Sequence, residues 1–339
     1  MTPDTDPVRV GVVGVGSMGK HHARVYSSHS DADLVGIVDA DDERAHTVAD
    51  EYGTDSYGFE TLLEGVDAAS LAVPTDYHAE YAARCLDAGV DVLVEKPLVD
   101  DLEAGKDLVR RAERTDRVLQ VGHIERYNPA VRTLADIVPD LDIIAVNAER
   151  LGPPRDRPIE DSAVLDLMIH DLDIVLAMLE DPPIAIQSAG VRNNRHATAT
   201  LSFGDDTVAT LTASRLTQEK VRTLEVVAEE AFVTVDYIDR SVEIHRQSTP
   251  EFITKDDDLR YRHESVVERP MVGNGEPLGK EIGSFLDSVR TREEPKISGE
   301  DGLQALYVAN RIERLADPDV PDADLRSSEA DGPLEVSLD

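Results

Sequence analysis

The sequence is poor in several residue types that would each indicate a particular class of protein. It contains one cysteine, Cys85, and no tryptophan among 339 residues. A single cysteine cannot form an internal disulfide. Because Cys85 lies in a predicted helix, we expect its side chain to be buried and to act as a small apolar group. No cluster of Cys and His has the spacing of metal ligands, so no metal site is predicted.

Long apolar runs are also missing. No stretch approaches the roughly 18 apolar residues that a membrane-spanning helix requires. The first residues, Met1–Asp6, lack the basic and apolar parts of a secretion signal. We therefore expect a cytoplasmic protein with no membrane partner.

Basic residues are scarce. The chain has 34 Lys and Arg against 69 Asp and Glu, which gives a net charge of −35, and only seven of the basic residues are Lys. No basic face is available to neutralise phosphates, so nucleic-acid binding is not expected. The acidic residues are spread along the chain, and a compact state with such self-repulsion requires screening by salt. This pattern predicts a halophilic protein from a high-salt cytoplasm. Regular apolar strands argue against the alternative, a disordered acidic protein.

The segment Val8–Gly19 carries the clearest motif. A run rich in valine is followed by three glycines with different roles. Gly14 permits a tight turn, Gly16 leaves room for a pyrophosphate, and Gly19 allows a helix to pack close to the strand. The phosphates would bind the amides at the N-terminus of that helix. The predicted cofactor-binding loop consists of Gly14, Gly16, Ser17, Met18 and Gly19.

A second strand, Leu34–Val38, ends in Asp39, 20 residues after Gly19. This is the position at which a carboxylate binds the adenosine ribose hydroxyls. A carboxylate repels a 2′-phosphate. The residues that follow Asp39 are mostly acidic, and the first arginine that could bind a 2′-phosphate is Arg44. We predict NAD as the cofactor, with NADP less favoured.

The first 120 residues alternate between strands and helices, which predicts a parallel, doubly wound Rossmann sheet. The expected strands are Val8–Val13, Leu34–Val38, Ala68–Val73, Asp91–Val94 and Val118–Val121, and the expected helices are Lys20–Ser27, Asp42–Tyr52, Tyr77–Ala88 and Leu102–Thr115.

The pattern changes after Gly122. Consecutive alternating strands between residues 184 and 245 predict a mostly antiparallel sheet in an α+β domain. Around it we expect helices at Pro129–Ile137, Ser162–Leu179, Pro277–Thr291 and Gly299–Leu315, and a strand at Asp142–Arg150. The predicted domains are an NAD-binding domain at 1–122, a substrate and oligomerisation domain at 123–316, and an acidic, flexible tail at 317–339.

Two clusters outside the glycine loop are candidates for chemistry. Glu95-Lys96-Pro97 follows a strand at the carboxyl edge of the parallel sheet, where ligands of such sheets bind. Asp166 and His170 are four residues apart on a predicted helix and would share a face, as a carboxylate that tunes a general base does. The alternatives are a solvated loop lysine and a surface ion pair. We place His21 and His22 on the helix surface or beside the cofactor.

Together these motifs resemble the glucose-fructose oxidoreductase/inositol dehydrogenase (Gfo/Idh/MocA) family over almost the whole chain. The resemblance implies hydride transfer between NAD(P) and a CH–OH group of a sugar, cyclitol or sugar nucleotide. It implies a catalytic group of Lys96, Asp166 and His170. It also places near the cofactor Val73, Pro74, Thr75, His78, Glu95 and Lys96.

The segment Val121–Val131 resembles the subgroup of UDP-N-acetylglucosamine 3-dehydrogenases. Glu125 replaces one of two adjacent basic residues that many cyclitol dehydrogenases carry here. Three arginines precede the catalytic helix, and arginine suits bidentate recognition of a diphosphate, although a solvated loop is the simpler interpretation. The predicted substrate-binding residues are His123, Arg126, Tyr127, Asn128, Arg150, Arg155 and Arg157.

The resulting hypothesis is an NAD-dependent dehydrogenase of a small-molecule sugar or sugar nucleotide, with UDP-N-acetylglucosamine 3-dehydrogenase as the first candidate. Alternatives are a dehydrogenase of a free sugar or an inositol-like cyclitol, and a non-catalytic NAD-dependent sensor on the same fold. We also expect a homodimer or homotetramer formed through the C-terminal sheet.

The charge of −35 generates a first prediction. Because repulsion between carboxylates destabilises the compact state unless salt screens it, the melting temperature should fall as KCl is lowered from multimolar to low concentration. Circular dichroism measures this directly. A melting temperature that stays the same over that range would contradict the prediction.

Overall fold

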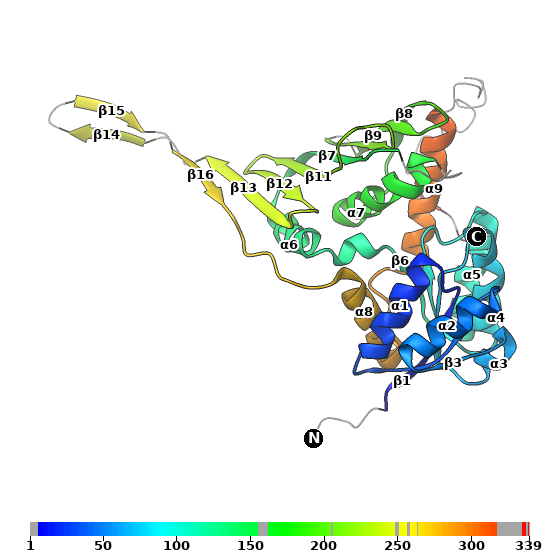
Figure 1. Cartoon of the computed structure of the whole chain (residues 1–339). Coiled ribbons are helices and arrows are strands. Elements are labelled where there is room, and N and C mark those ends of the chain that lie inside the picture. Colours follow the sequence, from blue (N-terminus) through cyan, green and yellow to red (C-terminus); the bar gives the residue numbers. More distant parts are fainter. Residues whose placement is uncertain are drawn as a thin grey trace. The chain divides into compact units, whose positions relative to one another are not determined.

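The computed structural model describes residues 6–154, 162–204, 206–247, 251–255, 258–262, 264–316, 334–336 and 338 (Figure 1). The chain divides into two compact units. The first unit comprises Met1–Tyr127, Gly275–Tyr307 and Val336–Asp339, and the second comprises Asn128–Asn274 and Val308–Glu335.

The first unit is built on a six-stranded sheet with the order β3-β2-β1-β4-β5-β6. All its strand pairs are parallel, which confirms the predicted doubly wound sheet. The strand order reverses between β1 and β4, and ligands of such sheets bind at the carboxyl ends of the strands beside this switch. The strands are β1 (Val8–Val13), β2 (Ala32–Val38), β3 (Asp55–Ser56), β4 (Ala68–Leu71), β5 (Asp91–Glu95) and β6 (Leu119–Gly122).

Local signals in the sequence explain where the helices of this unit begin. Asp41 accepts a hydrogen bond from the Arg44 amide at the start of α2, and Asp101 accepts one from the Ala104 amide at the start of α5. These helices have the predicted bounds. The helices are α1 (Ser17–Ser28), α2 (Asp42–Tyr52), α3 (Phe59–Leu63), α4 (His78–Asp87) and α5 (Leu102–Thr115), with short 3₁₀ turns at Thr75–Tyr77 and Ile124–Tyr127.

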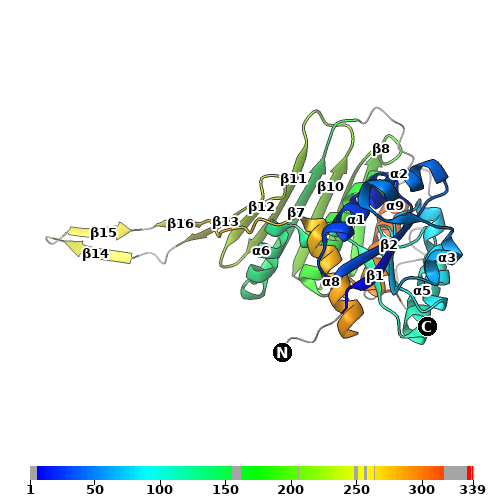
Figure 2. The same cartoon turned by 60° about the horizontal axis from the view of Figure 1, so that its bottom comes forward.

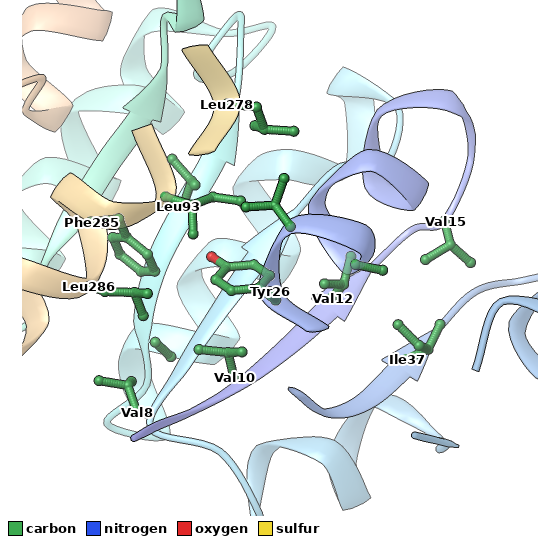
Figure 3. Packing of buried hydrophobic residues seen from close by; sticks show 14 of the residues in the cluster. Val8, Val10, Val12, Val15, Tyr26, Ile37, Leu93, Leu278, Phe285 and Leu286 are labelled. Atoms are coloured by element: carbon green, nitrogen blue, oxygen red, sulfur yellow. The ribbon is translucent and has the colours of Figure 1, made fainter. Parts of the chain in front are cut away.

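Helix α8 (Pro277–Thr291) belongs to this first unit, although the sequence analysis assigned it to the second domain. One face of α8 carries Leu278, Ile282, Phe285, Leu286 and Val289, all buried. These side chains pack with β1 and with Tyr26 of α1 in one apolar cluster (Figure 3). The helical spacing of the stripe predicts burial, but it does not specify the partner surface.

The second unit contains an eight-stranded sheet with the order β16-β13-β12-β11-β7-β10-β9-β8. Only the β7–β10 pair is parallel, so the predicted mostly antiparallel sheet is confirmed. Two further strands pair only with each other. The strands are β7 (Ile143–Leu151), β8 (Ala185–Val191), β9 (His196–Phe203), β10 (Thr207–Ser214), β11 (Val221–Ala228), β12 (Phe232–Asp236), β13 (Ser241–Gln247), β14 (Glu251–Lys255), β15 (Asp258–Arg262) and β16 (Ser265–Glu268).

Helices of the second unit pack against one face of this sheet. α6 (Pro129–Ile137) contacts β12 and β13, and α7 (Ile169–Leu179) contacts β7 and β10. Figure 2 shows α6 lying along the sheet. Burial alternates along β9 and β10, so their outward-facing side chains stay partly exposed. The predicted helix Ser162–Leu179 is divided, because Val164–Met168 form a π-helical turn before α7.

The last helix, α9 (Gly299–Ala316), begins in the first unit and ends in the second. No described helix is both long and apolar enough to cross a membrane. Most of the predicted tail 317–339 lies outside the described residues. Of its described residues, the Leu334 amide donates to the Pro183 carbonyl at 2.7 Å and the Val336 amide donates to Gln304 Oε1 at 2.9 Å.

Candidate functional site

The turn between β1 and α1 has the geometry that the glycine motif predicts. Gly14 has a φ of +84°, which favours glycine. A Cβ atom on Gly19 would lie 1.7 Å from the Gly14 carbonyl oxygen, so only glycine permits this approach of helix and strand. No atom lies within 4 Å of the Cβ position of Gly16. The loop therefore leaves open space beside the backbone amides where α1 begins, and it can take a pyrophosphate.

Asp39, at the end of β2, is hydrogen-bonded to this loop. Its carboxylate accepts the amides of Val15 at 2.7 Å and Asp41 at 2.9 Å, and it pairs with Arg44 at 2.9 Å. Partial burial raises the pKa of Asp39, but the two amides and the Arg44 guanidinium outweigh it and hold the pKa below its usual value. An ionised carboxylate therefore stands where the ribose hydroxyls are expected. Arg44, which the sequence analysis treated only as the nearest arginine, contacts it directly.

The other residues expected near the cofactor lie at the ends of the neighbouring strands β4 and β5. Val73, Pro74 and Thr75 follow β4, and Glu95 ends β5 with Lys96 directly after it. The Lys96–Pro97 peptide bond is cis. Because carboxyl ends of adjacent parallel strands lie at one edge of the sheet, both segments lie at the edge where sheets of this kind bind their ligands.

His78 is buried, with 1% of its surface exposed. Its Nδ1 lies 2.9 Å from the Pro97 carbonyl oxygen and its Nε2 lies 3.0 Å from the Val73 carbonyl oxygen. Both ring nitrogens therefore contact the backbone. This geometry indicates a residue that holds two loops together, and it does not favour a hydrogen bond from His78 to the cofactor.

Four expected substrate residues follow β6. His123, Tyr127 and Asn128 are buried, and Arg126 lies 3.8 Å from Asp301. Asn128 caps α6, because its Oδ1 accepts the Ala130 amide at 3.1 Å. A capping role explains the presence of this asparagine without a ligand.

The arginines expected to bind a diphosphate are in different situations. Arg150, on the inner face of β7, is 3% exposed and forms a bidentate ion pair with Asp171 of α7 at 2.6 and 2.8 Å. The Tyr237 ring lies 5.4 Å from its guanidinium carbon. This geometry does not favour diphosphate binding, because the two N–H groups with which Arg150 would bind a phosphate already donate to the Asp171 carboxylate. Arg155 and Arg157 lie outside the described residues.

The two predicted catalytic residues of the second unit lie in and just after the π-helical turn. Asp166 is within the turn and His170 is in the first turn of α7. Asp166 forms an ion pair with Arg215, the residue after β10. The Arg215 side chain is 7% exposed and that of Asp166 is 26% exposed. Asp173, three residues after His170 on α7, is buried.

Sequence reasoning missed two residues of these clusters. Arg215 is 49 residues from Asp166, and no local pattern relates them. His22 was expected on the helix surface or beside the cofactor, but it is buried and bonded to Glu95. A signal for its burial exists, because His22 continues the buried stripe of Gly19, Ala23 and Tyr26 along α1. Within the described part of the chain, no group of His, Cys, Asp and Glu could hold a metal ion.

Comparison with known proteins gives a consistent result. A family model described as "Oxidoreductase family, NAD-binding Rossmann fold" (GFO_IDH_MocA) matches residues 8–123, and the corresponding C-terminal domain model matches residues 148–234. UDP-N-acetylglucosamine 3-dehydrogenase of Acidithiobacillus ferrooxidans is 31% identical over 90% of this chain and 96% of that protein. Its crystal structure superposes with a TM-score of 0.82 over 92% of this chain and 98% of that one, at 30% identity.

Inositol 2-dehydrogenase of Rhizobium meliloti is also similar over its full length. It is 27% identical over 91% of this chain and 96% of that protein. The relatives therefore include a nucleotide-sugar dehydrogenase and several inositol dehydrogenases.

The contact between Asp39 and Arg44 generates a prediction on cofactor choice. Asp39→Ala removes the charge that repels a 2′-phosphate and releases Arg44 to bind one, so the ratio of kcat/KM for NAD to that for NADP should fall at least roughly 10-fold. Initial rates with both cofactors at saturating substrate measure it, and KM for the substrate should change less. In Asp39→Ala/Arg44→Ala the gain with NADP should disappear. Preference of the wild type for NADP would contradict the interpretation of Asp39.

Proposed function

The chain belongs to the Gfo/Idh/MocA family of NAD-binding oxidoreductases, and we propose that this member oxidises a ring hydroxyl of a sugar nucleotide, with UDP-N-acetylglucosamine and its 3-hydroxyl as the first candidate. The observation that carries the proposal is the similarity to a UDP-N-acetylglucosamine 3-dehydrogenase over 90% of the chain. Retention of Lys96, Asp166 and His170 supports a catalytic member of the family over a sensor.

The proposed chemistry assigns one role to each catalytic residue. His170 accepts the proton of the substrate hydroxyl as general base, and the Lys96 ammonium stabilises the negative charge that develops on the oxygen. Asp166 orients and tunes the imidazole. Bound NAD would supply the hydride acceptor for the carbon that carries the hydroxyl, and the overall reaction would give a ketone, NADH and a proton.

Arg215 is a further residue of the proposed catalytic group, and the sequence did not predict it. Its guanidinium is paired with the Asp166 carboxylate, and a nearby cation favours the ionised form of a carboxyl group. An Asp166 that stays ionised can support the protonated imidazole without taking its proton. We therefore assign the proton transfer to His170 and an electrostatic role to Asp166.

The outer face of the C-terminal sheet is a candidate surface for self-association. The outward side chains of β9 and β10 include no Asp, Glu, Lys or Arg. Glu149 of β7 and Glu225 of β11 lie on the same face, next to these two strands. We propose that a homodimer or homotetramer forms through this face. It would remove the threonine-rich outer surface of β9 and β10 from water.

A substrate screen tests the proposed function. UDP-N-acetylglucosamine, UDP-glucose, free N-acetylglucosamine, glucose and myo-inositol are each incubated with the protein and NAD in molar KCl, and NADH formation is followed. Turnover restricted to UDP-sugars supports the proposal. Preference for myo-inositol or a free aldose would support the second candidate, which the 27% identity to an inositol dehydrogenase over most of the chain favours. NADH binding with no turnover of any of these compounds would indicate the sensor.

Substitution of the proposed base and electrophile gives a further prediction. His170→Ala should lower kcat by roughly 10²–10⁴-fold, the contribution of a positioned base, and Lys96→Ala should also lower mainly kcat. NADH affinity, measured by fluorescence, should be retained in His170→Ala. His46→Ala and Lys106→Ala are matched controls, because these side chains lie on α2 and α5 away from the predicted crevice, and they should keep normal turnover. A surface ion pair would leave the rate unaffected, so near-normal turnover in His170→Ala would remove His170 from the mechanism.

The Asp166–Arg215 pair should affect both stability and rate. Arg215→Met leaves a largely buried carboxylate without its cation, which should lower the free energy of unfolding by about 2 kcal/mol and also lower kcat. Asp166→Asn should lower kcat and change its pH profile, because the charge beside the imidazole is lost. In Asp166→Asn/Arg215→Met much of the stability should return while kcat stays low. Urea denaturation and steady-state kinetics measure the two effects; recovery of full activity in the double variant would contradict a catalytic role for Asp166.

A further inference from the structure

The tripeptide Glu95-Lys96-Pro97 is held on both sides by a buried histidine. His22 of α1 contacts the Glu95 side chain, which precedes Lys96. His78 of α4 contacts the Pro97 carbonyl, which follows Lys96. Each histidine has 1% of its surface exposed.

The contact on the Glu95 side is part of a buried polar chain. His22 Nε2 lies 2.9 Å from Glu95 Oε1, and His22 Nδ1 lies 3.1 Å from Ser70 Oγ on β4. Ser70 in turn contacts the Tyr26 hydroxyl at 2.8 Å. Burial raises the pKa of Glu95, but hydrogen bonding to His22, the charges of His22 and Lys96, and the Lys96 amide together hold it below its usual value. The carboxylate is therefore kept ionised beside the Lys96 backbone.

Little space remains for Glu95 to move. A Cβ atom on Gly122, at the end of β6, would lie 3.2 Å from the Glu95 Cα and 3.3 Å from its carboxylate. The Glu95 side chain is only 13% exposed. Because Glu95 is confined in this way, the backbone position of the next residue, Lys96, is confined as well.

The contact on the Pro97 side is made with backbone oxygens. His78 Nδ1 lies against the Pro97 carbonyl oxygen and Nε2 lies against the Val73 carbonyl oxygen. His78 thereby ties the segment after β4 to the segment after β5.

Both histidines belong to helices that begin at predicted cofactor loops. α1 begins at Ser17 within the glycine loop, and α4 follows the turn Thr75–Tyr77 directly after Val73 and Pro74. We propose that His22 and His78 are positioning residues that fix Lys96, through Glu95 and Pro97, relative to the two cofactor loops. The role assigned to Lys96 rests on the proposed function.

A purely structural role for the histidines is the alternative. In that case the loss of activity in a histidine variant would result from a less stable sheet. In a double variant this loss would add to the loss caused by substitution of Lys96. If the histidines act through Lys96, the effects cannot add, because a group that is already absent cannot be misplaced. Double variants separate these outcomes.

The first arm of the experiment needs no substrate. Rates of lysine acetylation by acetic anhydride, which transfers an acetyl group to Nζ and releases acetate, are measured by mass spectrometry of peptides from wild type, His22→Gln and His78→Gln. Conditions are chosen in which each variant melts well above the assay temperature. The rate at Lys96 should change at least roughly threefold in both variants, since an ammonium held in place and one on a freely moving stem differ in accessibility. The rates at Lys106 and Lys280 should stay unchanged. His29→Gln, at the end of the same α1, should change none of them. An unchanged rate at Lys96 would overturn the proposal whether or not a substrate is known.

The second arm uses turnover. His22→Gln should lower kcat roughly 10-fold or more, as misplacement of a catalytic group does, and change the Kd for NADH less than threefold. Lys96→Met and Lys96→Met/His22→Gln should then have equal residual rates. Multiplicative losses would assign His22 to general stability and overturn the proposal. Glu95→Gln, which keeps the hydrogen-bonding shape, probes the same connection if His22→Gln folds poorly. Absence of turnover in the wild type would contradict only the proposed function, because the labelling arm still decides the role of the histidines.

Discussion

The close approach of α1 to the end of β1 is the contact on which the first unit depends. Gly19 lies against the Gly14 carbonyl with no room for a side chain, and this fixes the distance between the helix and the sheet. At that distance the His22 side chain of α1 is within hydrogen-bonding reach of Ser70 on β4 and Glu95 on β5. The glycine motif therefore does more than leave space for phosphates. It places α1 close enough for one imidazole to contact two strands of the sheet, β4 and β5.

The acid surplus of the chain contrasts with the use of arginine in the second unit. Arg150 and Arg215 are both buried and each pairs with a carboxylate on the segment that carries His170. Breaking a buried pair by removing one partner is far more destabilising than losing a surface pair. These two ion pairs therefore fix the position of α7 and the turn before it against the sheet. Salt that screens the surface carboxylates affects them much less.

Sequence patterns predicted most of the fold, because local signals there are strong. Helices α2 and α5 have capping aspartates, and β1 is a run rich in valine between polar segments. The sequence could not specify that α8 packs on β1, since an apolar stripe does not identify its partner. It could not pair Arg215 with Asp166, since only tertiary folding relates residues this far apart. The burial of Arg150 was missed because its partner, Asp171, lies on another element.

The π-helical turn Val164–Met168 has a consequence for helix phase. A π turn holds one residue more than an α turn, so the residues on its two sides are rotated by about 100° relative to an uninterrupted α-helix. That rotation determines which direction Asp166 faces while His170 keeps its place in α7. Removal of one residue between Asp166 and His170 would rotate the carboxylate by about 100° around the helix axis relative to α7. The position of the Asp166 carboxylate thus depends on a wide helical turn that is itself energetically unfavourable.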